Sequence, residues 1–411
     1  MPSMPEREQS NRIYADSLFF ILAIGLKPLY LHETGSLQIS DLFLVAGFLL
    51  SFLSKMQVCY SKNTSNWMLL FFICIVYQAV VNAAWAFLLQ KQGIDSAGMN
   101  QFTLYYLFNF FVAWYCLNLY FSYGFDVLKQ LLILGMLLSG VIAFVGVVLN
   151  TNNSTRSAGF FQNPNQLGYY AVVLLTVATY YKASIRSWMK YMMLAFAFIC
   201  LTVSLSKAAL ISAAIMLMLS IVFDPESRYN RNKAWKKAVL CVFGFAILYV
   251  ILFSDSSFIV SNRRMLEMRS RIINIGVEND SSLGIGRGYN RIIEIGNDLL
   301  WGVGEGAYKR FVSLSGVEVH STYGNMLVCY GIIGTIGYAL IWWKALFWNT
   351  NKLGRLIAFS GILLYGVTHN GIRNTLVWAL LTLFFIESDT GYNDGDEEIE
   401  NDAPASNEIM E

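Results

Sequence analysis

Charged residues are scarce in this chain. Only 14% of its 411 residues are Asp, Glu, Lys or Arg, whereas soluble domains carry about 25%. Apolar residues make up 56% of the chain, and the mean hydropathy is +0.49. This composition excludes an ordinary soluble domain and predicts an all-α, polytopic integral membrane protein.

Proline and paired cysteines are lacking as well. The chain has six prolines and six cysteines, and the cysteines show no paired spacing, so neither disulfides nor a metal site is expected. Asp394-Gly395-Asp396 lies in the acidic segment 388–411, which we expect to be a disordered cytoplasmic tail. We expect neither a metal nor a cofactor.

Apolar runs near the length that crosses a bilayer, about 20 residues, recur along the chain. They cover residues 16–32, 40–56, 66–90, 102–122, 127–149, 166–181, 188–204, 207–223, 237–254, 322–348, 355–368 and 373–387. The sequence thus predicts about twelve transmembrane helices. The polar N-terminus lacks the apolar core and cleavage site of a signal peptide, so we expect the first span to be retained.

The distribution of Lys and Arg orients these spans. Short loops rich in Lys and Arg stay in the cytoplasm, and such loops alternate along most of the chain with the nearly bare loops HETGSLQISD and KQGIDSAGMN. The N-terminus and the acidic tail are then inside, and the long loop 255–321, which we expect to contain short helices, is outside. Several basic residues nevertheless gather on the outer side, and a bound anion is the simplest reason for them.

His320 nearly closes the long loop and stands just before an apolar run. An imidazole at the mouth of a membrane helix can titrate near neutral pH and move protons. The alternative is an interfacial histidine with no proton to move. His320 is therefore the candidate for proton transfer.

Basic residues of the outer face are candidate ligands for an anion. Arg156 precedes the turn 163–165, whose amides would line a polar pocket with it unless the segment is only a helix-entry loop. Lys207 begins a span with almost no loop before it, and either binds phosphate or extends to the interface. Arg287 and Arg291 are four residues apart; on one helical face they would clamp a diphosphate, unless they form a lipid-facing stripe.

Two more outer segments carry charge. Residues 262–272 place arginines and methionines on different sides of a helix, a pattern typical of a helix on the membrane surface. The last outer turn, 368–374, adds His369 and Arg373. These two are either substrate ligands or the polar residues that so short a loop needs in any case.

Together these motifs resemble the bacterial O-antigen ligase and O-antigen polymerase family of membrane glycosyltransferases. The resemblance covers roughly residues 155–385 and rests on GFFQNPNQLG, SLSKAAL and GVGEGAY. Its most specific part is His320-Ser321, followed after nine residues by Gly331-Ile332-Ile333-Gly334. One position departs from the family, which usually has arginine where this chain has Lys207, so bidentate phosphate contact is lost there.

The resemblance implies metal-independent transfer of a glycan from an undecaprenyl-diphosphate-linked donor to a sugar hydroxyl. His320 would be the general base, a role that suits a neutral imidazole. Cationic and polar side chains would hold the sugar and stabilise the diphosphate leaving group. These ligands would be Arg287, Arg291, Arg156, Lys207, Arg373 and His369.

The resemblance also implies an organisation and a location. Residues 1–154 would be N-terminal transmembrane helices, and residues 155–387 the catalytic region, including the outer loop. The acceptor would be lipid A–core for a ligase or a lipid-linked glycan for a polymerase, and the sequence leaves both open. The protein would cross the bacterial cytoplasmic (inner) membrane with its site facing the periplasm, surrounded by lipid bilayer and without a nucleic-acid partner.

A secondary transporter or a polysaccharide export protein is the alternative. Transporters place charged sites at mid-membrane, in helices broken by Gly or Pro, and often contain internal repeats. In this chain most spans have apolar interiors, proline is scarce and no repeat is visible. Because the charges sit at the outer ends of the spans, the sequence favours a transferase.

Overall fold

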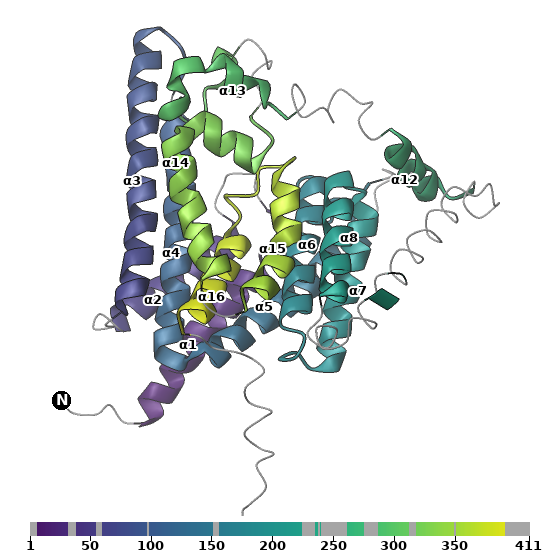
Figure 1. Ribbon diagram of the computed structural model, residues 1–411. Coiled ribbons are helices and arrows are strands. Elements are labelled where there is room, and N and C mark those ends of the chain that lie inside the picture. The colour runs from purple at the N-terminus through teal and green to yellow at the C-terminus, as the bar shows by residue number, and fades with distance from the viewer. Residues whose placement is uncertain are drawn as a thin grey trace, which may run out of the picture.

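The protein is helical throughout the part of the chain that the computed structural model describes. That part comprises residues 6–31, 38–54, 60–96, 98–150, 156–223, 235–236, 239, 261–274, 287–311, 318–348 and 351–390. Every regular element in these ranges is an α-helix or a short 3-10 helix (Figure 1). The predicted all-α fold is therefore confirmed for the described residues.

Within the described residues, eight helices precede the long loop and three follow it. The first group is α1 (Glu6–Gly25), α2 (Ile39–Ser54), α3 (Lys62–Lys91), α4 (Met99–Tyr123), α5 (Phe125–Leu149), α6 (Pro164–Tyr180), α7 (Ser187–Ser204) and α8 (Lys207–Val222). The last group is α14 (Thr322–Phe347), α15 (Lys352–Gly366) and α16 (Thr375–Thr390). Between them lie α12 (Arg263–Ile273), α13 (Asn290–Glu294), η2 (Gly296–Leu300) and η3 (Tyr308–Arg310). The predicted helix at 262–272 and the predicted short helices of the long loop are thus present.

Helices occupy eleven of the twelve apolar segments predicted from the sequence, and segment 237–254 lies outside the described residues. Among the described residues, five helices are long and apolar enough to cross a membrane: α3, α4, α5, α7 and α14. Shorter apolar helices lie within α1, α2 and α8. These features are those of a helical membrane protein.

The shorter helices α6 and α16 owe their position to sequences that are apolar on every side. A helix without a polar face is stable only when other helices surround it, and every residue of α16 from Thr375 to Ser388 is buried. Trp67 and Phe71 of α3 stack on Phe385 and Trp378 of α16, with ring centroids 4.4 and 4.5 Å apart. Residues 1–154 and 155–387 therefore share one core. Helix α16 continues three residues past 387, into the segment predicted to be a disordered tail. Residues 391–411 of that segment lie outside the described part.

α14 is interrupted at Gly331, whose backbone angles (φ 65°, ψ −168°) are not helical. An interruption leaves carbonyl groups of the preceding turn without their helical donors. Other donors replace them. The backbone N–H groups of Val303 and Gly304 donate to the carbonyls of residues 328 and 329 at 3.0 and 2.8 Å, respectively. The Tyr77 hydroxyl donates to the carbonyl of residue 330 at 3.2 Å. The glycine after the His320-Ser321 motif thus lets the outer loop pair with the broken helix.

We predict that Gly331→Ala destabilises the protein by at least about 2 kcal/mol, because side chains are strained at these angles. Its Cβ would also lie 2.5 Å from the backbone of Gly302 and Leu300. Thermal unfolding in detergent measures the effect. Gly98→Ala is the control, since Gly98 has a negative φ of −81° and open space around it. Equal melting temperatures for the two variants would contradict this role of Gly331.

Candidate active site

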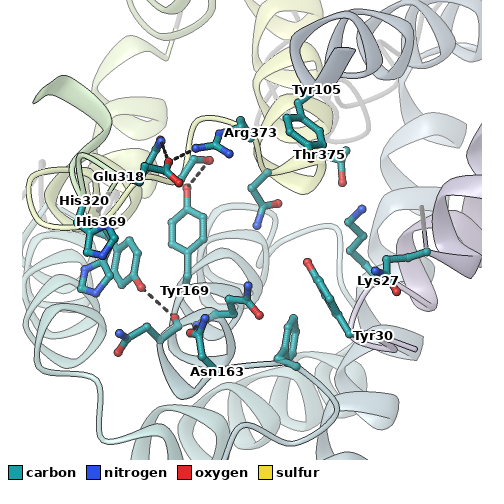
Figure 2. A pocket seen from close by; sticks show the side chains of 18 of the residues that line it. Lys27, Tyr30, Tyr105, Asn163, Tyr169, Glu318, His320, His369, Arg373 and Thr375 are labelled. Carbon is teal, nitrogen blue, oxygen red and sulfur yellow. Dashed lines mark hydrogen bonds and ion pairs between the residues drawn. The ribbon is translucent and has the colours of Figure 1, made fainter. Parts of the chain in front are cut away.

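A cavity of about 410 Å³ opens where α1 ends and α2, α6 and α16 begin (Figure 2). Four of the residues predicted to form the site line it: Arg287, His320, His369 and Arg373. Residues before 155 also line it, including Lys27, Tyr30 and Asp41. The site therefore extends beyond the predicted catalytic region, because helices from both regions meet at this end of the bundle.

His320 lies beside Arg287 at the edge of the cavity. Its side chain is exposed, and its backbone N–H donates to the carbonyl of Arg287 at 3.2 Å. Ser321, the next residue, is fully buried and caps α14 by accepting from Gly324 N at 3.1 Å. The Tyr289 hydroxyl lies 2.6 Å from the Ser321 hydroxyl. The serine of the motif thus anchors the helix, and the histidine is presented to the cavity.

His369 occupies the turn between α15 and α16 and is kept neutral. Its ring stacks on Tyr365, which stacks on Tyr169, with centroids 4.5 Å apart in both pairs. Burial, followed by the positive charges of Arg287, His320 and Arg156, lowers the pKa of His369 from 6.5 to about 3. At neutral pH this ring is a polar wall of the cavity rather than an effective proton acceptor.

Arg287 and Arg291 do not act as a pair, and the prediction that they share one helical face is wrong. Arg287 lies in a turn, whereas α13 begins only at Asn290. Arg291 is fully buried, and its guanidinium lies 4.8 Å from the Phe311 ring centroid and 5.2 Å from that of Tyr308. Arg287 lines the cavity, whereas Arg291 packs against aromatic residues of the same loop.

Arg156 and Lys207 lie outside the cavity lining. Arg156 donates to the Ser204 carbonyl at 2.9 Å and to Oδ1 of Asn165, which does line the cavity, at 2.8 Å. Arg156 therefore supports the wall from behind. Lys207 begins α8, and its ammonium approaches the carbonyl of Asn274, at the end of α12, at 3.5 Å. Lys207 thus connects the helix bundle to the outer loop.

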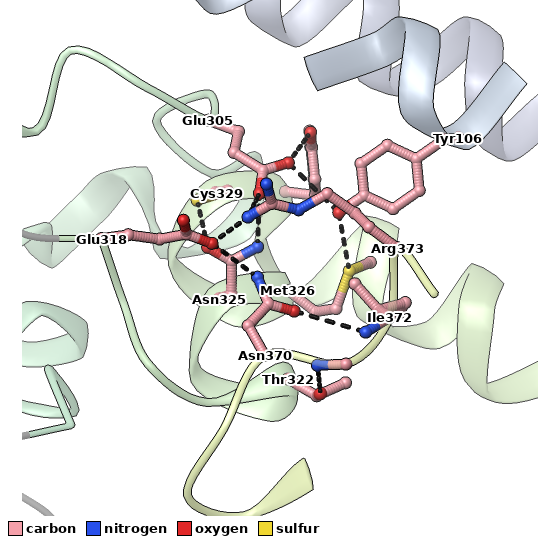
Figure 3. A network of polar contacts seen from close by, with 12 residues as sticks. Tyr106, Glu305, Glu318, Thr322, Asn325, Met326, Cys329, Asn370, Ile372 and Arg373 are labelled. Carbon is pink, nitrogen blue, oxygen red and sulfur yellow. Dashed lines mark hydrogen bonds and ion pairs between the residues drawn. The ribbon is translucent and has the colours of Figure 1, made fainter. Parts of the chain in front are cut away.

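Arg373 is held between two carboxylates (Figure 3). Its guanidinium lies 3.1 Å from Oε1 of the fully buried Glu305 and forms a second ion pair with Glu318. Asn325 donates to Glu305 at 2.8 Å, and Tyr330 donates to it at 2.7 Å. Burial alone lowers the pKa of Arg373, but the facing Glu305 raises it above its ordinary value, so the guanidinium stays charged.

The acidic residues of the site were not predicted from the sequence. Glu318 lines the cavity two residues before His320, and Asn370 donates to its carboxylate at 2.8 Å. Asp41 also lines it, 2.7 Å from Lys27. The sequence could have marked Glu305, because it lies in an apolar, glycine-rich stretch. A charged group in such surroundings needs a partner of opposite charge. Nothing in the sequence identified Arg373 as that partner.

The cavity combines groups suited to polar substrates. Arg287 supplies positive charge, and His320 supplies an exposed imidazole. Six Phe and Tyr rings and six amide side chains form much of the remaining wall. Within the described residues, no cluster of three or more His, Cys, Asp or Glu side chains is arranged to hold a metal ion. Comparisons with protein-family models, with curated proteins and with solved structures find no match to this chain.

The pKa of His369 leads to a prediction about acid stability. The unfolded chain binds a proton at this residue as the pH falls below 6.5, but the folded protein does so only near pH 3. Stability is therefore lost as the pH falls through this window, by about 1.4 kcal/mol per pH unit. Between pH 7 and 5, the free energy of unfolding of His369→Gln should fall by about 2 kcal/mol less than that of wild type. Thermal unfolding at the two pH values measures this difference. The same pH dependence in both proteins would contradict a neutral His369.

The two carboxylates on Arg373 should differ in their contribution to stability. Glu305 is fully buried, so Glu305→Gln should destabilise the protein by about 2–4 kcal/mol by removing one charge of a buried pair. Glu318→Gln should cost less than about 1 kcal/mol, because the Glu318 side chain is 29% exposed. Denaturation of both variants under one set of conditions tests the ranking, and a larger loss for Glu318→Gln would refute it.

Proposed function

We propose that the protein is a membrane glycosyltransferase that moves a glycan from a polyprenyl-diphosphate-linked donor to a sugar hydroxyl. One observation carries this proposal: Arg287 and His320, predicted as diphosphate ligand and base, are joined by a backbone hydrogen bond at the edge of a single cavity. A cation for the leaving group and an imidazole for the acceptor are the two groups that such a transfer needs.

In the proposed reaction the acceptor hydroxyl oxygen attacks the anomeric carbon of the donor. The hydroxyl proton passes to the imidazole of His320, and the bond between the anomeric carbon and the diphosphate oxygen breaks. The electron pair of that bond leaves with the lipid diphosphate, whose negative charge Arg287 stabilises. Arg373, held by Glu305 and Glu318, shapes the cavity wall instead of binding the leaving group.

The site would face the periplasm of a bacterial cytoplasmic membrane. The orientation derived from the basic loops puts the end of α1 and the starts of α2, α6, α14 and α16 outside, and the cavity lies at these helix ends. This agreement supports a bundle of about twelve spans with the N-terminus inside. The undecaprenyl-linked donor would enter from the bilayer.

The acceptor separates two forms of the proposal. A ligase would transfer the glycan to lipid A–core, and a polymerase would transfer it to a second lipid-linked glycan. The surface-glycan profile of a deletion strain tells them apart. Bare core with accumulated lipid-linked polymer indicates a ligase, and single repeat units on the core indicate a polymerase.

A secondary transporter is the competing function, and the broken helix α14 is the feature that favours it. In transporters the unwound backbone coordinates the cargo. Here carbonyl groups freed at Gly331 already accept hydrogen bonds from Val303, Gly304 and Tyr77. The break therefore supports the outer loop and offers no open ion site at those carbonyls.

We predict that His320→Ala lowers glycan transfer by at least about 100-fold, the usual contribution of a general base. The assay uses purified protein in nanodiscs with an undecaprenyl-diphosphate-linked oligosaccharide and an acceptor glycan. Because the side chain is exposed, the melting temperature should stay near that of wild type. Transfer at the wild-type rate by this variant would exclude His320 as the base.

The same assay tests Arg287. Arg287→Ala should weaken use of the donor, and Arg287→Lys should restore only part of it, because lysine cannot form bidentate contacts to a diphosphate. Arg291→Lys is the matched control, since the buried Arg291 lies away from the cavity. If Arg287→Lys restores the full rate, bidentate contact is not required.

A further inference from the structure

Six amide side chains line the cavity, and four of them stand at the starts of α6 and α16: Asn163, Asn165, Gln166 and Asn374. Three of them stand at the start of α6, and Asn374 directly precedes α16. In Figure 2 the labelled Asn163 lies across the cavity from Arg373. These residues face the same space as Arg287 and His320 but have no role in the reaction described above.

The carbonyl oxygen of each amide is already occupied by a protein donor. The bonds are Gln166 N to Asn163 Oδ1 (2.9 Å), Gln162 N to Gln166 Oε1 (3.2 Å), Leu376 N to Asn374 Oδ1 (3.0 Å) and Arg156 Nη2 to Asn165 Oδ1 (2.8 Å). Backbone N–H groups and guanidinium groups only donate, so the atom that accepts from them must be the oxygen. The NH2 group of each amide is thereby identified.

These NH2 groups remain for the cavity. Among the described residues, none of the four donates to another protein group, and none is enclosed within the protein. Each offers two N–H donors and no acceptor. The carboxylates that line the cavity, Asp41 and Glu318, are paired with Lys27 and Arg373. The four amide side chains at the starts of α6 and α16 therefore offer N–H donors to the cavity.

A surface of donors fits a ligand group made of acceptors. The non-bridging oxygens of a diphosphate accept hydrogen bonds from Asn and Gln side chains and have no proton to donate in their ionised form. A sugar hydroxyl, in contrast, brings a proton that needs an acceptor of its own. We propose that the NH2 groups of Asn163, Gln166 and Asn374 bind the oxygens of a diphosphate, while Asn165 is held in place by Arg156.

This inference rests on the proposed function only for the identity of the carrier lipid. Arg287 would add positive charge to the same site. The amides would bind the diphosphate before and after transfer.

Replacing an amide side chain by the carboxylate of the same shape should change ligand binding without changing the fold. Asn163→Asp, Gln166→Glu and Asn374→Asp keep the oxygen that accepts from the backbone, and Asp caps a helix as well as Asn does. The group facing the cavity changes from a donor to a negatively charged acceptor. These variants should therefore fold like wild type and repel a diphosphate.

Calorimetric titration of the full-length protein in nanodiscs with inorganic pyrophosphate tests the inference. Gln166→Glu and Asn374→Asp should each bind at least about 10-fold more weakly than wild type, the effect of losing one hydrogen bond to a charged group. Gln162→Glu is the matched control, since Gln162 belongs to the same loop but not to the cavity lining. It should bind as wild type does.

Parallel titrations identify the source of the diphosphate. Tighter binding of undecaprenyl diphosphate than of pyrophosphate, lost in the same two variants, assigns the site to the lipid carrier; equal binding assigns it to a free diphosphate. Unchanged affinity in both carboxylate variants, with unaltered melting temperatures, overturns the inference. Because the readout is binding, a protein that binds diphosphate but transfers no glycan would refute the proposed function alone.

Discussion

The buried ion pair between Glu305 and Arg373 is the constraint on which this end of the molecule depends. A carboxylate with no solvent exposure must be paired and hydrogen-bonded. Glu305 meets this requirement through Arg373 of the α15–α16 turn, Asn325 and Tyr330 of α14, and Tyr106 of α4. Three other segments of the chain therefore converge on this one carboxylate, and Arg373 also lines the cavity.

Arg373 transmits this constraint to the catalytic candidate. Its second partner, Glu318, lies two residues before His320, and both residues line the cavity. Val319 between them is fully buried. The hydrogen bond from His320 N to the Arg287 carbonyl brings the turn at 287 alongside. His320 and Arg287 are thus linked, through Glu318 and Arg373, to the buried carboxylate of Glu305.

The polar residues at the helix starts serve the fold and the cavity at once. Asn163 and Asn374 each use the amide oxygen to satisfy a backbone N–H group at the start of a helix and present the NH2 group to the cavity. Ser321 is different, because its hydroxyl is buried and used entirely for packing and capping. A capping residue can therefore contribute to a site only where its second polar atom remains accessible.

The amino-acid sequence alone determined the helical architecture and the positions of the apolar segments, because hydropathy and helix length are local properties. It also marked His320, Arg287, His369 and Arg373, since charged residues near the end of an apolar run are visible without coordinates. Tertiary structure decided which of these act together. Arg287 and Arg291 are equally basic and close in sequence, yet the helix begins between them and buries only one. Likewise, the carboxylates that neutralise Arg373 lie at residues 305 and 318, a pairing that arises from packing between distant segments.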